Sequence, residues 1–206
     1  MPSTVVHLAV GGIVAAALLG DDFDRRSVAV VLAATAVPDL DTFAGLYLQG
    51  THRALLHTLL LPLAAGALLA YDTRVRETSW LRDHWGGRGV HVSWVAVAAL
   101  LFGGVLPDLM TNGVNAFYPL YDRFLTVDGE LLLSNQRGVV QTFVDLSPPE
   151  KAPSTTQNTH YWTGVDPSRG DEPEDVERIF PVVRSGFQTL VVLLGAFTLG
   201  ARFRDR

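Results

Sequence analysis

Four long apolar stretches constrain this chain more than any other feature of its sequence. They cover residues 4–20, 54–70, 90–107 and 182–201, about 17 to 20 residues each. That is the lower end of the length that crosses the hydrocarbon core of a bilayer as an α-helix. A fifth run at 27–38 has only 12 residues, so it could be a short or tilted span, a buried core helix or a re-entrant piece.

Composition favours membrane helices. Hydrophobic residues make up 48% of the chain and the mean hydropathy is +0.23. Leucine and alanine dominate the long runs, which favours helix over strand. The alternative is a soluble all-helical protein with very apolar core helices, but GGIVAAALLG at 11–20 has almost no polar face, which a surface helix should show. A cleaved signal peptide fits poorly, because no Lys or Arg precedes the first run.

The arginines predict an orientation in the membrane. They cluster in the connections 20–27 and 71–89 and in the tail after 201, whereas the short connection 39–53 holds Arg53 alone. With five spans, the three arginine-rich segments share one face, which should be cytoplasmic. Four spans would place the arginines of 20–27 and those of 71–89 on opposite faces of the membrane. We therefore predict an all-α integral protein of the inner or plasma membrane with about five transmembrane helices, its N-terminus outside and its C-terminus cytoplasmic.

Three regions follow from this layout: a helical membrane domain at 1–120, an outer segment at 121–181, and a last helix with an arginine-rich tail at 182–206. In the outer segment, RFLTVDGELLLSN alternates around Asp128-Gly129 and predicts a small β-hairpin with its turn there. GVVQTFVDL at 138–146 could add a third strand. The segment is either a solvated cap or a lid over a site.

Side chains of the kinds that bind metals gather at the predicted outer ends of four apolar segments. They are His7, Asp39, Asp41, His52, His57 and Asp108. Each alone has a structural explanation, such as a turn after proline for the aspartates or an interfacial position for His7. His57 is the most informative, because ionisable groups inside an apolar run are rare and usually functional. Together they predict a metal site.

Spacing and ligand type refine that prediction. In an extended segment, Asp39 and Asp41 would point the same way, so they could share one ion or bridge two. On a helix, His52 and His57 would be about 140° apart, so they converge only if His52 lies in the entering loop. Because the chain has no cysteine, a site would use His and carboxylate ligands, which suit Zn²⁺, Mn²⁺ or Fe²⁺. Bridging carboxylates would allow a two-metal hydrolytic centre.

An early histidine, PDLD at 38–41, HRALLHT at 52–58 and an aspartate shortly before TNG together resemble the YdjM/YbcI-type inner-membrane proteins over about residues 1–125. This family, also known as DUF457, is described as predicted membrane-bound metal-dependent hydrolases, distantly similar to zinc-dependent phospholipase C and P1 nuclease. The resemblance implies that the six residues named above are ligands of one or two ions.

One position departs from the family pattern. Such proteins typically carry H-x-x-x-D in the fourth segment, one helical turn apart, so that both side chains meet one ion. Here the position four before Asp108 is Gly104. His160 in NTHYW is the candidate replacement, and Asn112 and Asn115 are weaker candidates.

The expected function is metal-dependent hydrolysis of a phosphoester in a membrane lipid or lipid-linked substrate. Asp39 or Asp41 could also act as the general base, and Arg53 could hold a phosphate oxygen. Arg53 could equally be an interfacial arginine among lipid headgroups. The competing interpretation is a non-catalytic scaffold or binding protein with a degenerate or structural metal site. A transporter fits less well, because the charges gather at one face and not at mid-membrane. With a net charge of −5 and no basic stripe, nucleic acid is not an expected partner.

Overall fold

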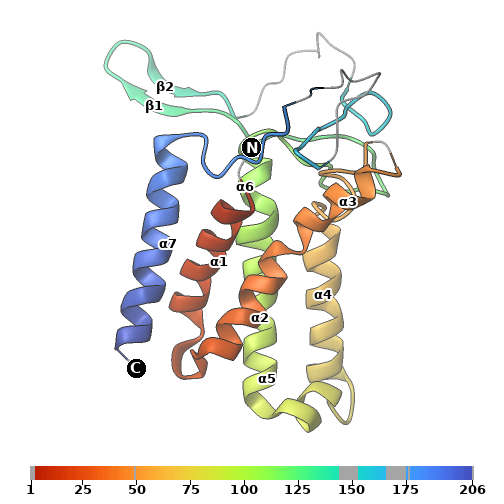
Figure 1. Ribbon diagram of the computed structural model, residues 1–206, viewed down its shortest axis with the longest axis vertical. Coiled ribbons are helices and arrows are strands. Elements are labelled where there is room, and N and C mark those ends of the chain that lie inside the picture. Colours follow the sequence, from red (N-terminus) through yellow and green to blue (C-terminus); the bar gives the residue numbers. More distant parts are fainter. Residues whose placement is uncertain (1–2, 49, 144–152, 166–174, 176, 206) are drawn as a thin grey trace.

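The computed structural model describes residues 3–48, 50–143, 153–165, 175 and 177–205, and is mostly helical (Figure 1). The α-helices are α1 (Thr4–Leu18), α2 (Arg25–Ala36), α3 (Asp41–Gly45), α4 (Leu60–Ala70), α5 (Trp80–Ala99), α6 (Leu106–Leu109) and α7 (Gly186–Arg204). The 3-10 turns are η1 (Gly20–Asp22) and η2 (Pro38–Leu40), and the π-helical segments are η3 (Tyr71–Val75) and η4 (Leu100–Val105). Strands β1 (Leu131–Ser134) and β2 (Gly138–Gln141) form one antiparallel pair.

Two helical stretches within the described residues are long and apolar enough to cross a membrane. They are Trp80–Leu109, which joins α5, η4 and α6, and Gly186–Arg204. A third span results if α2 and the Pro38–Gly45 turns, bent by 46°, count as one. The apolar helix α1 is shorter, with 15 residues. The structure therefore supports two or three spans and leaves the predicted number of about five unconfirmed.

Polar side chains cap the starts of the long helices. The Asp24 carboxylate accepts a hydrogen bond from the Ser27 amide at 2.8 Å where α2 begins. Ser79 and Ser185 do the same for α5 and α7, at 3.2 Å each. Such caps satisfy amides that have no partner within the helix.

Helix α5 starts ten residues before the apolar run predicted at 90–107, with a kink at Gly86.

The helices pack side by side, with α1 between α7 and α2 and with α5 alongside α2 (Figure 1). Small residues allow the close approach, as in many membrane bundles. A Cβ added to Gly195 of α7 would lie 2.7 Å from the Ala9 carbonyl oxygen of α1. The main apolar core, which includes Leu19, Phe23 and Val31, lies toward the end where α1 finishes and α2 begins.

Three local predictions were wrong. Residues 51–59 are not helical and α4 begins at Leu60, although the apolar run starts at 54. Asp39 and Asp41 lie in helical turns, not in an extended segment, so the argument that they point the same way fails. The hairpin turn falls at 135–137 and not at Asp128-Gly129, so 138–141 is the second strand.

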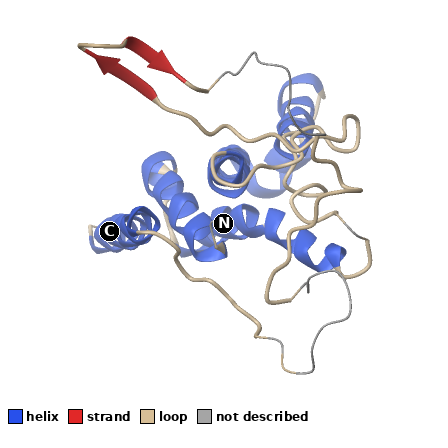
Figure 2. Ribbon diagram, turned by 90° about the horizontal axis from the view of Figure 1, so that it is seen from above, coloured by secondary structure: helices blue, strands red, loops and turns tan. Residues whose placement is uncertain are grey.

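The hairpin extends away from the helices (Figure 2). Gly138 follows the turn with φ +69°, a conformation that glycine adopts readily and that helps fix the turn there. The proposed third strand extends into residues outside the described part of the chain beyond 143.

Candidate metal centre

We call the six predicted ligands, His7, Asp39, Asp41, His52, His57 and Asp108, the metal-type residues. They lie on four separate segments that meet at one end of the helical bundle (Figure 1). His7 lies in the first turns of α1, Asp39 in η2 and Asp108 in α6. His52 and His57 lie in the loop 51–59 between α3 and α4. Residues more than 100 positions apart in sequence thus meet at one site.

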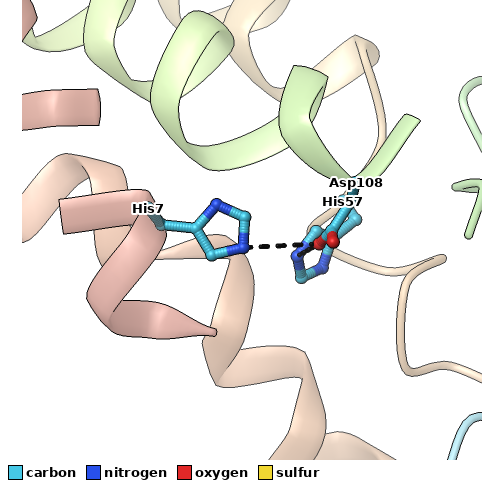
Figure 3. A group of neighbouring side chains, drawn as sticks. All are labelled: His7, His57 and Asp108. Atoms are coloured by element: carbon cyan, nitrogen blue, oxygen red, sulfur yellow. Dashed lines mark ion pairs between the residues drawn. The ribbon is translucent and has the colours of Figure 1, made fainter. Parts of the chain in front are cut away.

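His7, His57 and Asp108 form the centre of this group (Figure 3). One potential ligand atom from each lies within 4.8 Å of the others, and all three residues are buried. The His57 Nε2 is 2.9 Å from the Asp108 Oδ2, and the His7 Nε2 is 3.5 Å from the same oxygen. Asp39 is next to them, with Oδ1 at 3.7 Å from the His7 Nε2 and 3.6 Å from the His57 Nε2.

Hydrogen bonds on the far side of each ring fix the tautomers. The His7 Nδ1 is 2.6 Å from the Gly103 carbonyl oxygen, and the His57 Nδ1 is 2.9 Å from the Asp41 Oδ2. Both oxygens can only accept, so each Nδ1 carries the proton and donates. In the neutral rings, each Nε2 then points its lone pair toward the Asp108 carboxylate.

These two Nε2 atoms are buried and make no hydrogen bond within the described part of the chain. Buried polar atoms in proteins almost always have a partner, and a lone pair facing a carboxylate oxygen is repulsive unless a proton or a metal cation lies between them. Histidines that bind metals almost always donate their other N–H to a carboxylate or a carbonyl, which both rings do here. The arrangement therefore fits a divalent cation.

The loop 51–59 folds around the carboxylate of Asp41. Its Oδ1 accepts a hydrogen bond from the His52 Nδ1 at 2.9 Å, and its Oδ2 accepts from the Arg53 amide at 3.0 Å as well as from His57. Asp41 is fully buried. Both oxygens are occupied by these donors, so Asp41 orients the two histidines and lies outside the group of potential ligand atoms. These long-range bonds also explain why the loop is not helical.

Arg53 holds Asp108 from the opposite side. It is fully buried, its φ is +64°, and its Nη2 forms an ion pair with the Asp108 Oδ1. Its Nη1 donates to the Gly113 carbonyl at 3.2 Å, and its guanidinium lies 5.0 Å from the centre of the Tyr161 ring. A fully buried arginine is not in contact with lipid headgroups. The alternative prediction, that Arg53 is an interfacial arginine among headgroups, therefore does not fit the structure. The geometry gives Arg53 a positioning role toward Asp108.

Gly104, where the family pattern expects a histidine, packs tightly against α2 and η2. A Cβ added there would lie 2.9 Å from the Pro38 Cγ and 2.9 Å from the Thr35 carbonyl oxygen. A histidine would need these elements to move apart. The neighbouring Gly103 supplies the carbonyl that accepts the hydrogen bond from His7, so the close approach of η4 also sets the position of a candidate ligand.

His160 and Asn115, two of the proposed replacements for the missing histidine, do not take its place in the structure. Within the described residues, the group of potential ligand atoms does not include His160. Both ends of the Asn115 side chain are used, since it donates to Asp122 at 2.6 Å and accepts from the Arg123 amide at 3.2 Å. The backbone carbonyl of Asn112 accepts a hydrogen bond from the Tyr161 hydroxyl at 2.8 Å. These residues thus connect the outer segment to the site.

Two titratable groups of the outer segment have shifted pKa values. Burial raises the pKa of the Tyr161 phenol above its ordinary value, against the opposing effect of the Arg53 guanidinium. At Asp122, burial also acts to raise the pKa, but hydrogen bonds from Thr156 and Asn115 outweigh it and hold the pKa below its ordinary value. Asp122 therefore stays ionised and holds Thr156 to the loop that carries Asn115.

Sequence reasoning missed the roles of Asp41, Tyr161 and the Gly103 carbonyl. The aromatic run NTHYW was a signal for Tyr161, since aromatic residues in an outer segment often pack over a site. No sequence signal marks a backbone carbonyl as the partner of a histidine 96 residues away.

The fold and the buried polar group together define a helical membrane protein with a candidate site for a divalent metal. The family model of the YdjM inner membrane protein matches residues 1–151, and the chain belongs to this family. No curated protein and no solved structure gave a significant match.

Proposed function

We propose that this protein is a membrane-bound, metal-dependent hydrolase that acts on a phosphoester of a lipid or lipid-linked substrate at the outer membrane face. The observation that carries the proposal is the pair of buried Nε2 atoms, from His7 and His57, that point at Asp108 without a hydrogen bond. This donor set suits Zn²⁺, with Mn²⁺ or Fe²⁺ as alternatives. A bound ion would supply water activation near neutral pH and polarisation of a phosphoryl oxygen.

The residues of the site have separate roles in this proposal. His7, His57 and Asp108 hold the ion, while Asp41 and Arg53 keep these ligands in place through the bonds described above. Asp39 is the candidate general base, since its side chain is 23% exposed and its Oδ2 has no hydrogen-bond partner among the described residues. A carboxylate so placed can accept a proton from water beside the ion. A distant likeness to zinc-dependent phospholipase C and P1 nuclease remains part of this proposal.

The topology is also proposed: about five spans, with the N-terminus outside. Because the chain has no cysteine, single cysteines can report sidedness. Leu133→Cys in the exposed hairpin should react with a membrane-impermeant maleimide on intact spheroplasts, and Asp205→Cys should react only after permeabilisation. Labelling of Asp205→Cys on intact cells would contradict the orientation.

The activity test uses protein purified in detergent, stripped with chelator and reloaded with Zn²⁺, Mn²⁺ or Fe²⁺. We expect metal-dependent phosphoester cleavage in a panel of phospholipids and phosphorylated lipids. Asp39→Asn should lower turnover at least about 100-fold if Asp39 is the general base, and Asp24→Asn at the opposite end should not change it.

The competing function is a scaffold with a structural metal site, and the close packing of Gly104 in place of a ligand favours it. A protein that binds the metal tightly and cleaves no member of the panel would support the scaffold and overturn the hydrolase proposal.

A further inference from the structure

A pocket of about 430 Å³ opens beside the metal-type residues. Among its lining residues, Asp39, Thr42 and His52 are polar and less exposed than the large apolar ones, and we call these three the floor of the pocket. The apolar lining includes Leu40, Phe43, Val165, Ile179 and Phe180. The volume falls within the range of small-molecule sites, roughly 300–1,000 Å³.

Two polar atoms of this floor have no hydrogen-bond partner among the described residues. His52 is 4% exposed, and its Nδ1 donates to Asp41, so in the neutral ring its Nε2 is an acceptor. This Nε2 is buried without a hydrogen bond in the described part of the chain, and so is the Asp39 Oδ2. Buried acceptors without a donor are rare, so the floor is suited to a ligand that supplies hydroxyl or amine donors.

Asp39 joins the pocket to the proposed metal site. It lines the pocket, and its Oδ1 lies 3.7 Å from the His7 Nε2 and 3.6 Å from the His57 Nε2. A ligand on this floor would therefore have its polar end next to the metal-type group.

Part of the wall comes from residues beyond the YdjM match, which ends at 151. Residues 163–165 and 179–181 of the outer segment line the pocket together with residues of α3 and the start of α1. Phe180 and Phe43 remain 66% and 54% exposed, so the rim is apolar and open. An apolar rim over a polar floor matches an amphiphile, whose chain meets the rim and whose headgroup reaches the floor.

We infer that this pocket binds an amphiphile that combines an apolar chain with an anionic phosphate and hydroxyl or amine donors, and that residues 163–165 and 179–181 select its chain. This inference rests on the proposed function, since it assigns the substrate pocket of the same site. His52 is a specificity residue that accepts a hydrogen bond from the headgroup, and Phe180 contacts the chain.

The first test measures binding of two probes with the same headgroup, glycerol dodecylphosphonate and glycerol methylphosphonate, to metal-loaded protein. The wild type should bind the dodecyl probe at least about 10-fold more tightly. Phe180→Ala should reduce that preference several-fold while bound metal per chain stays unchanged. Phe197→Ala on α7 is the matched control, because Phe197 is 74% exposed and does not line the pocket. Equal binding of both probes, or equal losses in the two variants, would overturn the inference.

A second test uses His52→Asn, whose amide can still donate to Asp41 but has no atom in place of Nε2. Binding of the glycerol probe should weaken about 10-fold, whereas binding of dodecylphosphonate without glycerol should not change. Unchanged binding of the glycerol probe would contradict the role of His52. Because both tests measure binding, their failure is distinguishable from failure of the hydrolase proposal, which is measured as phosphoester cleavage.

Discussion

The two ends of the helical bundle carry charge in opposite ways. At the end where α2 and α5 begin, the pairs are exposed: Arg88 and Asp24 are 50% and 44% exposed, and His91 and Asp22 are 45% and 27% exposed. At the other end, His57 and Asp108 are 1% and 3% exposed, and Arg53 is fully buried. The same kinds of side chains are therefore solvated at one end and removed from water at the other.

The difference separates surface charge from the candidate metal centre. Exposed ion pairs contribute little to stability, because solvent and salt screen them. Buried charges cost several kcal/mol per ion, by order of magnitude, unless partners or a metal compensate. A group of buried histidines and aspartates with two inward-facing Nε2 atoms is thus hard to explain by stability alone, and the proposed bound cation would account for it.

The largest expected effect comes from Asp108→Asn. This change removes a proposed ligand and the ion-pair partner of Arg53, and breaking a buried pair costs about 3–5 kcal/mol. Bound metal should fall below detection, and the melting temperature in detergent should drop by several degrees. If the metal content matches that of the wild type, Asp108 is not a ligand.

Asp41→Asn should have the next largest effect. Loss of the carboxylate that orients His52 and His57 should weaken metal binding about 10- to 100-fold, as other changes behind ligand histidines do. Competition with a chelating dye measures the affinity. An unchanged dissociation constant would show that Asp41 does not act through the histidines.

Gly104→Ala tests the close approach of η4 to Pro38. The added methyl group has no room and should destabilise the protein by about 1–3 kcal/mol, as overpacking does. Gly200→Ala on α7 is the control, since no atom of the described residues lies within 4 Å of a Cβ there, and its melting temperature should stay unchanged or rise. Equal melting temperatures for both variants would contradict the packing argument.

A smaller effect concerns pH at the outer segment. Because the folded-state pKa of Asp122 is lowered, its contribution to stability is complete above the ordinary value of 3.8 and is lost as the pH falls through the folded-state pKa. Hydrogen exchange at the Thr156 amide, corrected for intrinsic rates, should show protection that falls in this acid range. Asp122→Asn should show no such step, and a step that persists in the variant would assign it to another group.

The smallest effect is expected for Asp24→Asn in the exposed pair with Arg88. The hydrogen bond from the Arg88 guanidinium is the main cause that lowers the pKa of Asp24, but both groups are open to solvent. At physiological salt, the metal content and melting temperature should match those of the wild type. A large loss of metal content or a large drop in melting temperature would contradict the contrast between the exposed charges at one end and the buried charges at the other.

The sequence allowed the helical class and the cluster of candidate ligands to be predicted, because apolar length and isolated ionisable residues are local signals. His7, His57 and Asp108 could be placed at one end from the span order alone. The start of α4 at Leu60 could not, since it depends on long-range bonds from the loop 51–59 to Asp41. For the same reason, Asp41 was predicted as a ligand or base and not as the anchor of that loop.

Other features depend on contacts that no single segment encodes. The close packing at Gly104 requires Thr35 from α2 and Pro38 from η2, and the pocket wall requires residues more than 100 positions from Asp39. The hairpin turn was misplaced because Asp128-Gly129 is a strong turn signal, yet the strands pair around a turn at 135–137, about seven residues later.

The central claim is that His7, His57 and Asp108 hold a divalent cation. X-ray absorption spectroscopy of the purified wild-type protein, combined with metal analysis, tests it most directly. We predict at least one transition-metal ion per chain, coordinated by two imidazole nitrogens and carboxylate oxygen, with imidazole scattering reduced in His57→Ala. A protein that binds no transition metal after reloading, or whose bound metal shows no imidazole ligands, would contradict the account.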